Sequence, residues 1–209
     1  MINEFEKRLL SSMILIPLSI FFIIKGSIFF IFFLSILFLI TSYEWVKMNK
    51  KNDLVKFSGI IYLFLSFYTV FEVRDNLDFK DFLFIITICI FTDIGGYIFG
   101  KTFNGPKLTR ISPKKTYAGV FGGFLLSLAA GLLFAHYLVI DEIVFKDDLI
   151  FIILILFISL ISQTGDLTIS FFKRKAKIKD TGKILPGHGG LLDRIDGMIF
   201  VFPIFYLIT

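Results

Sequence analysis

A polar stretch near the carboxyl end of the chain, residues 162–196, carries the residue types that phosphate chemistry needs. It holds four Asp, the glycine-rich sequence PGHGG and seven cationic side chains, namely Lys173, Arg174, Lys175, Lys177, Lys179, Lys183 and Arg194. Basic side chains and bare backbone N–H groups bind phosphate oxygens, and carboxylates bind hard divalent cations. Because this stretch lies between two apolar runs, it indicates metal-assisted phosphate chemistry on a lipid.

Three acids of this stretch are candidates for a metal site. Asp166 lies at the end of an apolar run, with a serine four residues away on either side on one helical face. Asp193 and Asp196 are three residues apart and also share a face. A carboxylate at the centre of a membrane helix costs roughly 2.5–3.5 kcal/mol, so intramembrane acids are functional by default. We therefore favour a cation site over simple salt bridges to neighbouring Lys and Arg.

Two further acids lie within apolar runs. Asp93 is followed by Gly95 and Gly96, which allow another backbone or a ligand to approach closely. Glu44 either snorkels beside Trp45 or has a function, and the sequence leaves both possibilities open.

A second basic segment, residues 101–116, directly precedes another apolar run. Its cations and hydroxyls lie where a helix should begin, and the positive end of the helix dipole suits a polyphosphate; these residues are Ser112, Lys114, Lys115 and Thr116. The alternative is that its lysines serve only as a membrane anchor. His188, in the glycine loop between cations, is a candidate for phosphate binding or acid–base catalysis.

The elements that must position these residues are membrane helices. The chain has 209 residues, 56% of them hydrophobic, with 29 Phe and a mean hydropathy of +0.84, more than one soluble core can bury. Seven apolar runs, at about 9–24, 27–46, 57–71, 82–100, 117–140, 149–169 and 195–209, predict an all-α polytopic membrane protein with about seven transmembrane helices. The first run has no small-x-small cleavage site after it, so we expect it to be retained.

The distribution of charge predicts the orientation. Of the 22 Lys and Arg, 18 lie at the amino terminus and in the loops after the second, fourth and sixth runs. Positive loops face the cytoplasm, so the N-terminus is expected to be cytoplasmic and the C-terminus extracytoplasmic. The net charge of +5 thus belongs to membrane loops and does not indicate nucleic-acid binding. We expect an integral protein of the bacterial inner membrane whose active site faces the cytoplasm.

The chain divides into two expected regions. Residues 1–81 should form three N-terminal membrane helices, and residues 82–209 the catalytic membrane region, with basic cytoplasmic loops at 101–116 and 170–194. Small residues cluster on the fourth and fifth runs, which predicts that these two helices pack tightly: Gly95, Gly96, Gly100, Ala118, Gly119, Gly122, Gly123 and Gly131. The single Cys89 excludes disulfides and is expected to be a packing residue.

Residues 82–202 resemble the phosphatidate cytidylyltransferases, also called CDP-diacylglycerol synthases. The resemblance rests on Ser112-Pro113-Lys114-Lys115-Thr116, Ser162-Gln163-x-Gly165-Asp166-Leu167, Ser170-Phe-Phe-Lys173-Arg174, Lys179-Asp180-Thr-Gly182, Leu185-Pro186-Gly187-His188-Gly189-Gly190 and Asp193-Arg194-Ile-Asp196. The chain departs from the family at Gly197, where Ser is common, and at Ile94, where Thr or Ser usually follows the Asp. It is also shorter than most members, with fewer N-terminal spans.

The resemblance implies transfer of a cytidylyl group from CTP to phosphatidate, a lipid of the membrane. It also implies Mg²⁺ as the cofactor and allows a second cation at the site. The residues it implies as catalytic are Asp166, Lys173, Arg174, Asp180, His188, Asp193, Arg194 and Asp196. Those implied for substrate binding are Ser112, Lys114, Lys115, Thr116, Lys179, Gly189 and Gly190, with the metal on Asp166, Asp193 and Asp196. The attacking lipid phosphate is largely ionised at neutral pH, so no strong general base is needed.

Two other functions compete with this one. A membrane kinase or transferase acting on a polyprenol or another lipid alcohol would need a general base, either His188 or Asp180. A transporter of phosphorylated solutes would usually repeat its broken spans in both halves, and here the unusual chemistry lies in the second half. The sequence is compatible with a homodimer.

Overall fold

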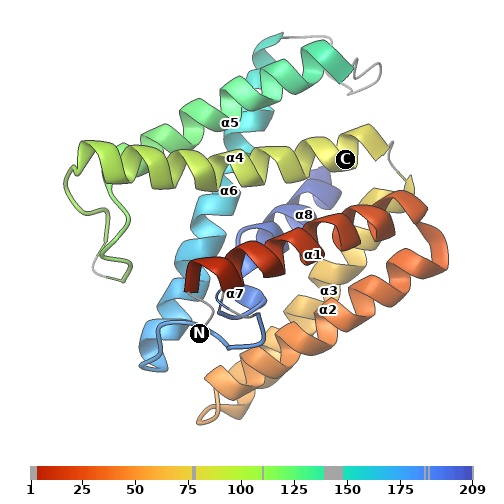
Figure 1. The fold of residues 1–209 in the computed structure, drawn as a ribbon, viewed down its shortest axis with the longest axis vertical. Helices are drawn as coiled ribbons and strands as arrows, with labels where there is room; N and C mark the ends of the chain where they lie inside the picture. The colour runs from red at the N-terminus through yellow and green to blue at the C-terminus, as the bar shows by residue number, and fades with distance from the viewer. Residues whose placement is uncertain are drawn as a thin grey trace.

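A computed structural model of the chain describes residues 4–76, 79–109, 111–138, 148–185, 187 and 189–208. Within these residues it contains eight helices: α1 (Glu4–Lys25), α2 (Ser27–Met48), α3 (Asp53–Asn76), α4 (Phe79–Phe103), α5 (Tyr117–Leu138), α6 (Asp148–Lys175), α7 (Leu192–Ile195) and α8 (Met198–Ile208). The only extended pairings in the described part are two isolated antiparallel bridges. The expected all-helical fold is therefore confirmed (Figure 1).

Among the described residues, five helices, α2 to α6, are long and apolar enough to cross a membrane. The last apolar run is divided, because Asp196 and Gly197 form a turn that separates α7 from α8. α8 has 11 residues and is about 16 Å long, whereas the hydrocarbon core of a bilayer is about 30 Å thick. The polytopic character is supported, and the count of seven spans stays a prediction.

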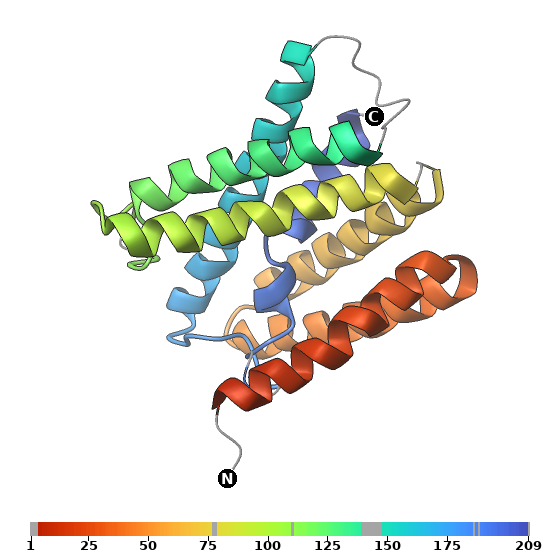
Figure 2. The ribbon, with the colours of Figure 1, turned by 45° about the horizontal axis from the view of Figure 1, so that its top comes forward.

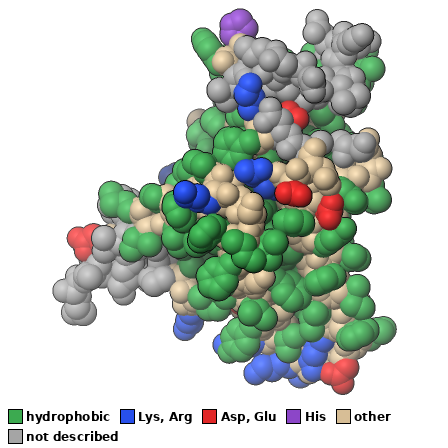
Figure 3. Space-filling model, turned by 90° about the vertical axis from the view of Figure 1, so that its right-hand side faces the viewer, with side chains coloured by type: hydrophobic (Ala, Val, Ile, Leu, Met, Phe, Trp, Pro, Cys, Tyr) green, Lys and Arg blue, Asp and Glu red, His purple; other side chains and the backbone are tan. Residues whose placement is uncertain are grey.

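The surface of the molecule is itself largely apolar. Large hydrophobic side chains are exposed along the long helices, among them Phe29 at 52%, Leu39 at 66% and Phe64 at 59%. Figure 3 shows hydrophobic side chains over much of one face, with Lys and Arg gathered at the lower end, where the α2–α3 turn lies in Figure 1. Exposure on this scale is stable only against lipid.

Helices α4 and α5 lie side by side along their lengths (Figure 2). A Cβ atom on Gly95 would overlap the carbonyl group of Gly122, and one on Gly119 would lie 2.7 Å from the carbonyl oxygen of Gly96. Only glycine allows two helix backbones to approach this closely. The predicted tight packing of these two helices is confirmed.

Helix α6 crosses α4 and α5 steeply and also contacts α8 (Figure 1). Its apolar residues Ile155 and Ile158 are fully buried in a core shared with Ile85 and Ile88 of α4. The Thr92 hydroxyl donates to Ser159 Oγ at 2.9 Å, which adds a polar link between α4 and α6. Cys89 is buried in the same core, as expected for a packing residue.

Helix α8 is tied to α3 through a backbone group that a proline leaves unpaired. Pro203 has no N–H to donate to the carbonyl oxygen of Ile199 four residues earlier. Ser66 Oγ of α3 donates to that oxygen at 2.8 Å, and Tyr62 Oη approaches it at 3.3 Å. The side chains of α3 thus satisfy a carbonyl group that would be costly to bury alone in lipid.

Candidate active site

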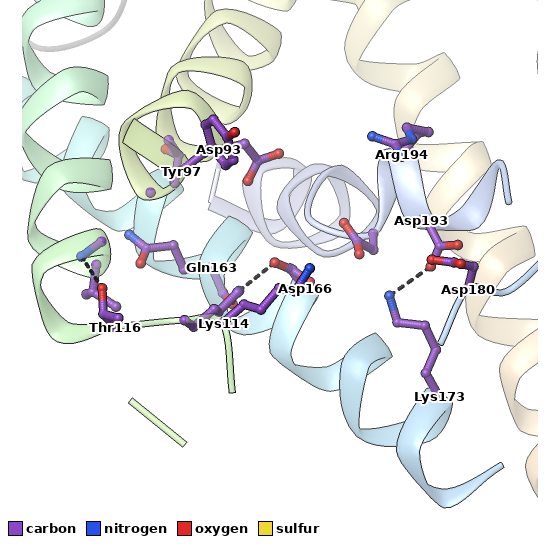
Figure 4. A pocket seen from close by; sticks show the side chains of 16 residues that line it. Asp93, Tyr97, Lys114, Thr116, Gln163, Asp166, Lys173, Asp180, Asp193 and Arg194 are labelled. Atoms are coloured by element: carbon purple, nitrogen blue, oxygen red, sulfur yellow. Dashed lines mark hydrogen bonds and ion pairs between the residues drawn. The ribbon is translucent and has the colours of Figure 1, made fainter. Parts of the chain in front are cut away.

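A pocket of about 420 Å³ lies between α4, the start of α5, α6 and the segment around α7 (Figure 4). Five carboxylates and four cations line it, together with smaller polar groups: Asp93, Asp166, Asp180, Asp193 and Asp196, with Lys114, Lys115, Lys173 and Arg194. The second basic segment and the polar stretch therefore meet in one place, although more than 40 residues separate them in the sequence.

Helix α6 carries three of the polar side chains on one face. Asp166, Ser170 and Lys173 follow each other at intervals of four and three residues, which places them on one side of a helix. The Ser170 hydroxyl donates to Asp166 Oδ1 at 3.3 Å. Lys173 is only 9% exposed and forms an ion pair with Asp193, with 2.8 Å between Nζ and Oδ1.

The second basic segment folds back on itself before α5 begins. Its backbone pairs Lys107 with Thr116, and Leu108 N donates to the carbonyl oxygen of Lys115 at 2.8 Å. Thr116 Oγ1 accepts a hydrogen bond from Gly119 N at 3.1 Å, as an N-cap does. This arrangement brings Lys115 to Asp166, with 2.5 Å between Nζ and Oδ2.

Asp193 organises the loop that precedes it. Besides Lys173, its carboxylate accepts hydrogen bonds from Thr181 N at 2.8 Å and from Gly190 N at 3.3 Å. Between these two donors, Leu185 and Gly189 pair through two backbone hydrogen bonds, and Gly189 has φ +88°, which favours glycine. Asp193 therefore closes the loop of residues 181–190 by direct hydrogen bonds.

Glu44 of α2 supports the same loop from the other side. It is 1% exposed and accepts hydrogen bonds from Thr181 Oγ1 at 2.9 Å, Leu191 N at 3.0 Å and Leu192 N at 2.9 Å. The two backbone groups belong to the first turn of α7, where N–H groups have no partner within the helix. The possibility that Glu44 snorkels to the surface is therefore wrong, since its carboxylate points into the protein.

Three carboxylates line the pocket beside Asp193: Asp166 accepts from Ser170 and pairs with Lys115, Asp196 accepts from Gly197 N at 3.0 Å, and Asp93 extends from α4. Asp93, Asp166 and Asp196 line one pocket, so their negative charges repel one another. A group of acids that disfavour each other's ionisation fits a divalent cation, which stabilises all of them as anions. In the described part of the chain no three His, Cys, Asp or Glu side chains are already arranged around a common metal position.

Several of the predicted site residues do not line the pocket. The Arg174 guanidinium donates to the carbonyl oxygens of Ile111 at 3.2 Å and Ile178 at 3.3 Å, which fastens the second basic segment to the end of α6. The carbonyl group of Ser112 accepts a hydrogen bond from Lys115 N, and Lys179 lines a different groove. His188 lies outside the described residues.

The pocket also contains residues that the motifs did not single out as site residues. Tyr97 lies one helical turn after Asp93, and Gln163 lies three residues before Asp166 (Figure 4). Their spacing from the acids, i+4 and i−3 on a helix, is the signal that would have identified them.

The position of Gly197 explains one departure from the resembling family. A Cβ atom on residue 197 would overlap the Ser162 hydroxyl, which is buried. The space that a serine side chain would need at position 197 is thus taken by the serine of α6.

Comparison with known proteins extends over this whole site. The profile described as "Cytidylyltransferase family" matches residues 54–209, which include every residue that lines the pocket. A phosphatidate cytidylyltransferase of Rickettsia felis is 32% identical over 209 residues, covering 97% of this chain and 91% of the relative. Relatives with the same name are 34% identical in Rickettsia bellii, over 97% of this chain and 89% of the relative, and 37% in Bacillus subtilis, over 83% and 65%.

Proposed function

The chain belongs to the cytidylyltransferase family, and from this membership we propose that it transfers the cytidylyl group of CTP to phosphatidate, forming CDP-diacylglycerol and pyrophosphate. The observation that carries the proposal is the pocket in which the acids and cations of the motifs converge. It lies among helices suited to a membrane, so one site could receive both a soluble nucleotide and a lipid phosphate. A homodimer is compatible with this proposal.

The reaction requires two anions to meet. An oxygen of the lipid phosphate attacks the α-phosphorus of CTP, and the bond from that phosphorus to the bridging oxygen breaks, so that pyrophosphate leaves with the electron pair. Because the nucleophile is already ionised near neutral pH, the protein has to orient it and offset charge more than accept a proton. Lys114, Lys115, Lys173 and Arg194 surround the pocket and supply positive charge for this purpose.

Mg²⁺ is part of the proposal. Asp166 and Asp196 would hold it together with Asp93, and Asp166 would exchange its ion pair with Lys115 for the cation. Asp193 is held instead by Lys173 and by two backbone N–H groups of the loop. When bound, the cation would neutralise charge on the phosphate oxygens. Asp180 also lines the pocket and would serve a second cation.

We further propose that the site opens to the cytoplasm of a bacterial inner membrane. The support is the concentration of Lys and Arg in alternate loops. A reporter fused at Lys177 should be cytoplasmic and one fused at Asp147 extracytoplasmic. The reverse labelling would contradict the orientation without affecting the proposed chemistry.

One assay tests the function directly. Purified protein is mixed with CTP, phosphatidate and Mg²⁺, and both pyrophosphate and CDP-diacylglycerol are measured. We expect equal amounts of the two products, and none when diacylglycerol replaces phosphatidate. Release of CDP with phosphorylation of a lipid alcohol would favour the kinase, and solute counterflow without turnover would favour the transporter.

A further inference from the structure

A second hollow, with a volume of about 950 Å³, lies between the α2–α3 turn and the segment that follows α6. Seven lysines line it: Lys47, Lys50, Lys51, Lys175, Lys177, Lys179 and Lys183. Among the described residues that line this basic groove, Asp180 is the only acid. The groove is thus more strongly cationic than the active pocket, where acids and cations are nearly balanced.

The lysines of the basic groove have no carboxylate partner among the described residues. The ion pairs among the described residues join Lys56 to Asp53, Lys115 to Asp166 and Lys173 to Asp193, and none of these lysines lines the groove. Of the groove lysines, Lys47 lies over the Tyr43 ring at 5.7 Å, a contact that leaves its charge in place. Like charges gathered around one groove raise the local positive potential, which attracts an anion.

The position of the groove indicates which anion. α2 ends at Met48 and α6 at Lys175, and both are candidate membrane spans, so the groove lies where two spans reach the headgroup region. Figure 1 shows the α2–α3 turn and the segment after α6 at the same end of the molecule. Basic pockets at the cytoplasmic ends of membrane helices are suited to anionic lipid headgroups.

The lining of the groove also favours a lipid over a soluble phosphate. Met48, Val55, Ala176 and Ile178 lie among the lysines and give the groove an apolar wall. A lipid presents a phosphate and an apolar glycerol ester region together, whereas a free phosphate has no use for the apolar wall.

We propose that the basic groove binds the phosphate of an anionic phospholipid of the surrounding membrane, at a site separate from the active pocket. Of the residues that line the two hollows, only Asp180 is shared. The groove also contacts Thr181 and Gly182, so the bound lipid would bridge the α2–α3 turn and the loop that Glu44 and Asp193 hold.

The test compares two lipids that differ only in headgroup charge. The purified full chain in neutral detergent is titrated with phosphatidylglycerol or with phosphatidylcholine of the same acyl chains, and bound lipid is counted by native mass spectrometry. We expect the protein to retain phosphatidylglycerol preferentially. Each surface lysine contributes about fivefold in affinity, so Lys50→Gln/Lys51→Gln should weaken phosphatidylglycerol binding roughly 25-fold.

The matched control is Lys101→Gln/Lys107→Gln, which removes the same charge from exposed lysines outside the groove. It should leave the lipid preference intact. Equal retention of both lipids, or equal weakening by the two double variants, would overturn the proposal. Displacement of phosphatidylglycerol by inorganic phosphate or CTP at comparable concentration would also overturn it, since the groove would then be a soluble-phosphate site. None of these outcomes depends on turnover, so they are independent of the proposed reaction.

Discussion

The Thr181 hydroxyl lies 2.9 Å from the Glu44 carboxylate, although the two residues are 137 positions apart in the sequence. On its other side the same hydroxyl lies 3.1 Å from Asp193 Oδ2, and Asp193 in turn pairs with Lys173. A chain of contacts therefore runs from the second helix of the protein to the wall of the active pocket. Its first member is the only one outside the recognised motifs.

Replacement of Glu44 should disturb this chain. Glu44→Ala leaves the buried N–H groups of Leu191 and Leu192 without an acceptor, at about 1–3 kcal/mol each, while the Thr181 hydroxyl keeps Asp193, so we expect a loss of at least about 2 kcal/mol of stability. Turnover should fall as well, because the loop that carries Asp193 loses its support. Thermal unfolding in detergent and the rate of CDP-diacylglycerol formation measure the two effects.

A carboxylate on the surface provides the control for Glu44. Asp53 pairs with Lys56 at 2.6 Å but its side chain is 95% exposed, so Asp53→Asn should change stability by less than about 1 kcal/mol. If Glu44→Ala resembled Asp53→Asn in both measurements, the support that we assign to Glu44 would be refuted.

The acids of the pocket should separate into two classes. Asp93→Asn, Asp166→Asn and Asp196→Asn each remove a proposed cation ligand, and we expect turnover to fall by about 10²–10³ with a higher Mg²⁺ requirement. Asp193→Asn should instead lower the unfolding temperature, because Lys173 loses its ion pair in a buried setting. Its residual activity should keep the original Mg²⁺ dependence. A shifted Mg²⁺ requirement in Asp193→Asn alone would assign the cation to Asp193.

Lys114 is expected to contact the nucleotide. It lines the pocket just before α5, whereas its neighbour Lys115 is already paired with Asp166. Loss of one charge-assisted hydrogen bond corresponds to roughly tenfold in binding, so Lys114→Ala should raise the CTP concentration for half-maximal rate by about that factor. Lys101→Ala, at the end of α4, is the control. An unchanged CTP requirement would mean that Lys114 serves only as a membrane anchor.

Two adjacent glycines test the contact between α4 and α5. A Cβ atom on Gly95 would overlap the Gly122 backbone, whereas one on Gly96 would find its nearest neighbour at 3.8 Å. Gly95→Ala should therefore cost about 1–3 kcal/mol, and Gly96→Ala should be tolerated. At about 2–4 °C per kcal/mol, thermal unfolding resolves the difference. Equal unfolding temperatures would mean that the two helices separate more easily than their packing suggests.

The helices could be predicted from the sequence because each depends on a local apolar run, whereas the meeting of the two polar segments in one pocket was implied only by the family resemblance. A long apolar run in lipid can satisfy its backbone only as a helix, and this holds for α4 as well as for α6. The turn at Asp196 and Gly197 was harder to foresee, because the apolar run of residues 195–209 continues through it. At this turn Gly197 packs against Ser162 of α6, a contact that the sequence does not reveal.

The roles of individual side chains depend on contacts that spacing does not reveal. Arg174 follows Lys173 directly in the sequence, but consecutive helical residues point about 100° apart, and here Lys173 lines the pocket while Arg174 donates to the carbonyl oxygens of Ile111 and Ile178. A glutamate beside a tryptophan in an apolar run is compatible with snorkelling, and only the position of the α7 backbone distinguishes the two possibilities for Glu44.

The burial of Glu44 also limits how the protein can be recombined. The family profile begins at residue 54, so the matched region contains all the pocket residues but excludes Glu44. A chimera that joins residues 54–209 to the first two helices of a relative would retain every motif. It would nevertheless lack an acceptor beneath the catalytic loop unless the transplanted helix offers an acid at the same depth. Residues 54–209 can therefore be transferred to another protein only together with an acceptor that replaces the Glu44 side chain.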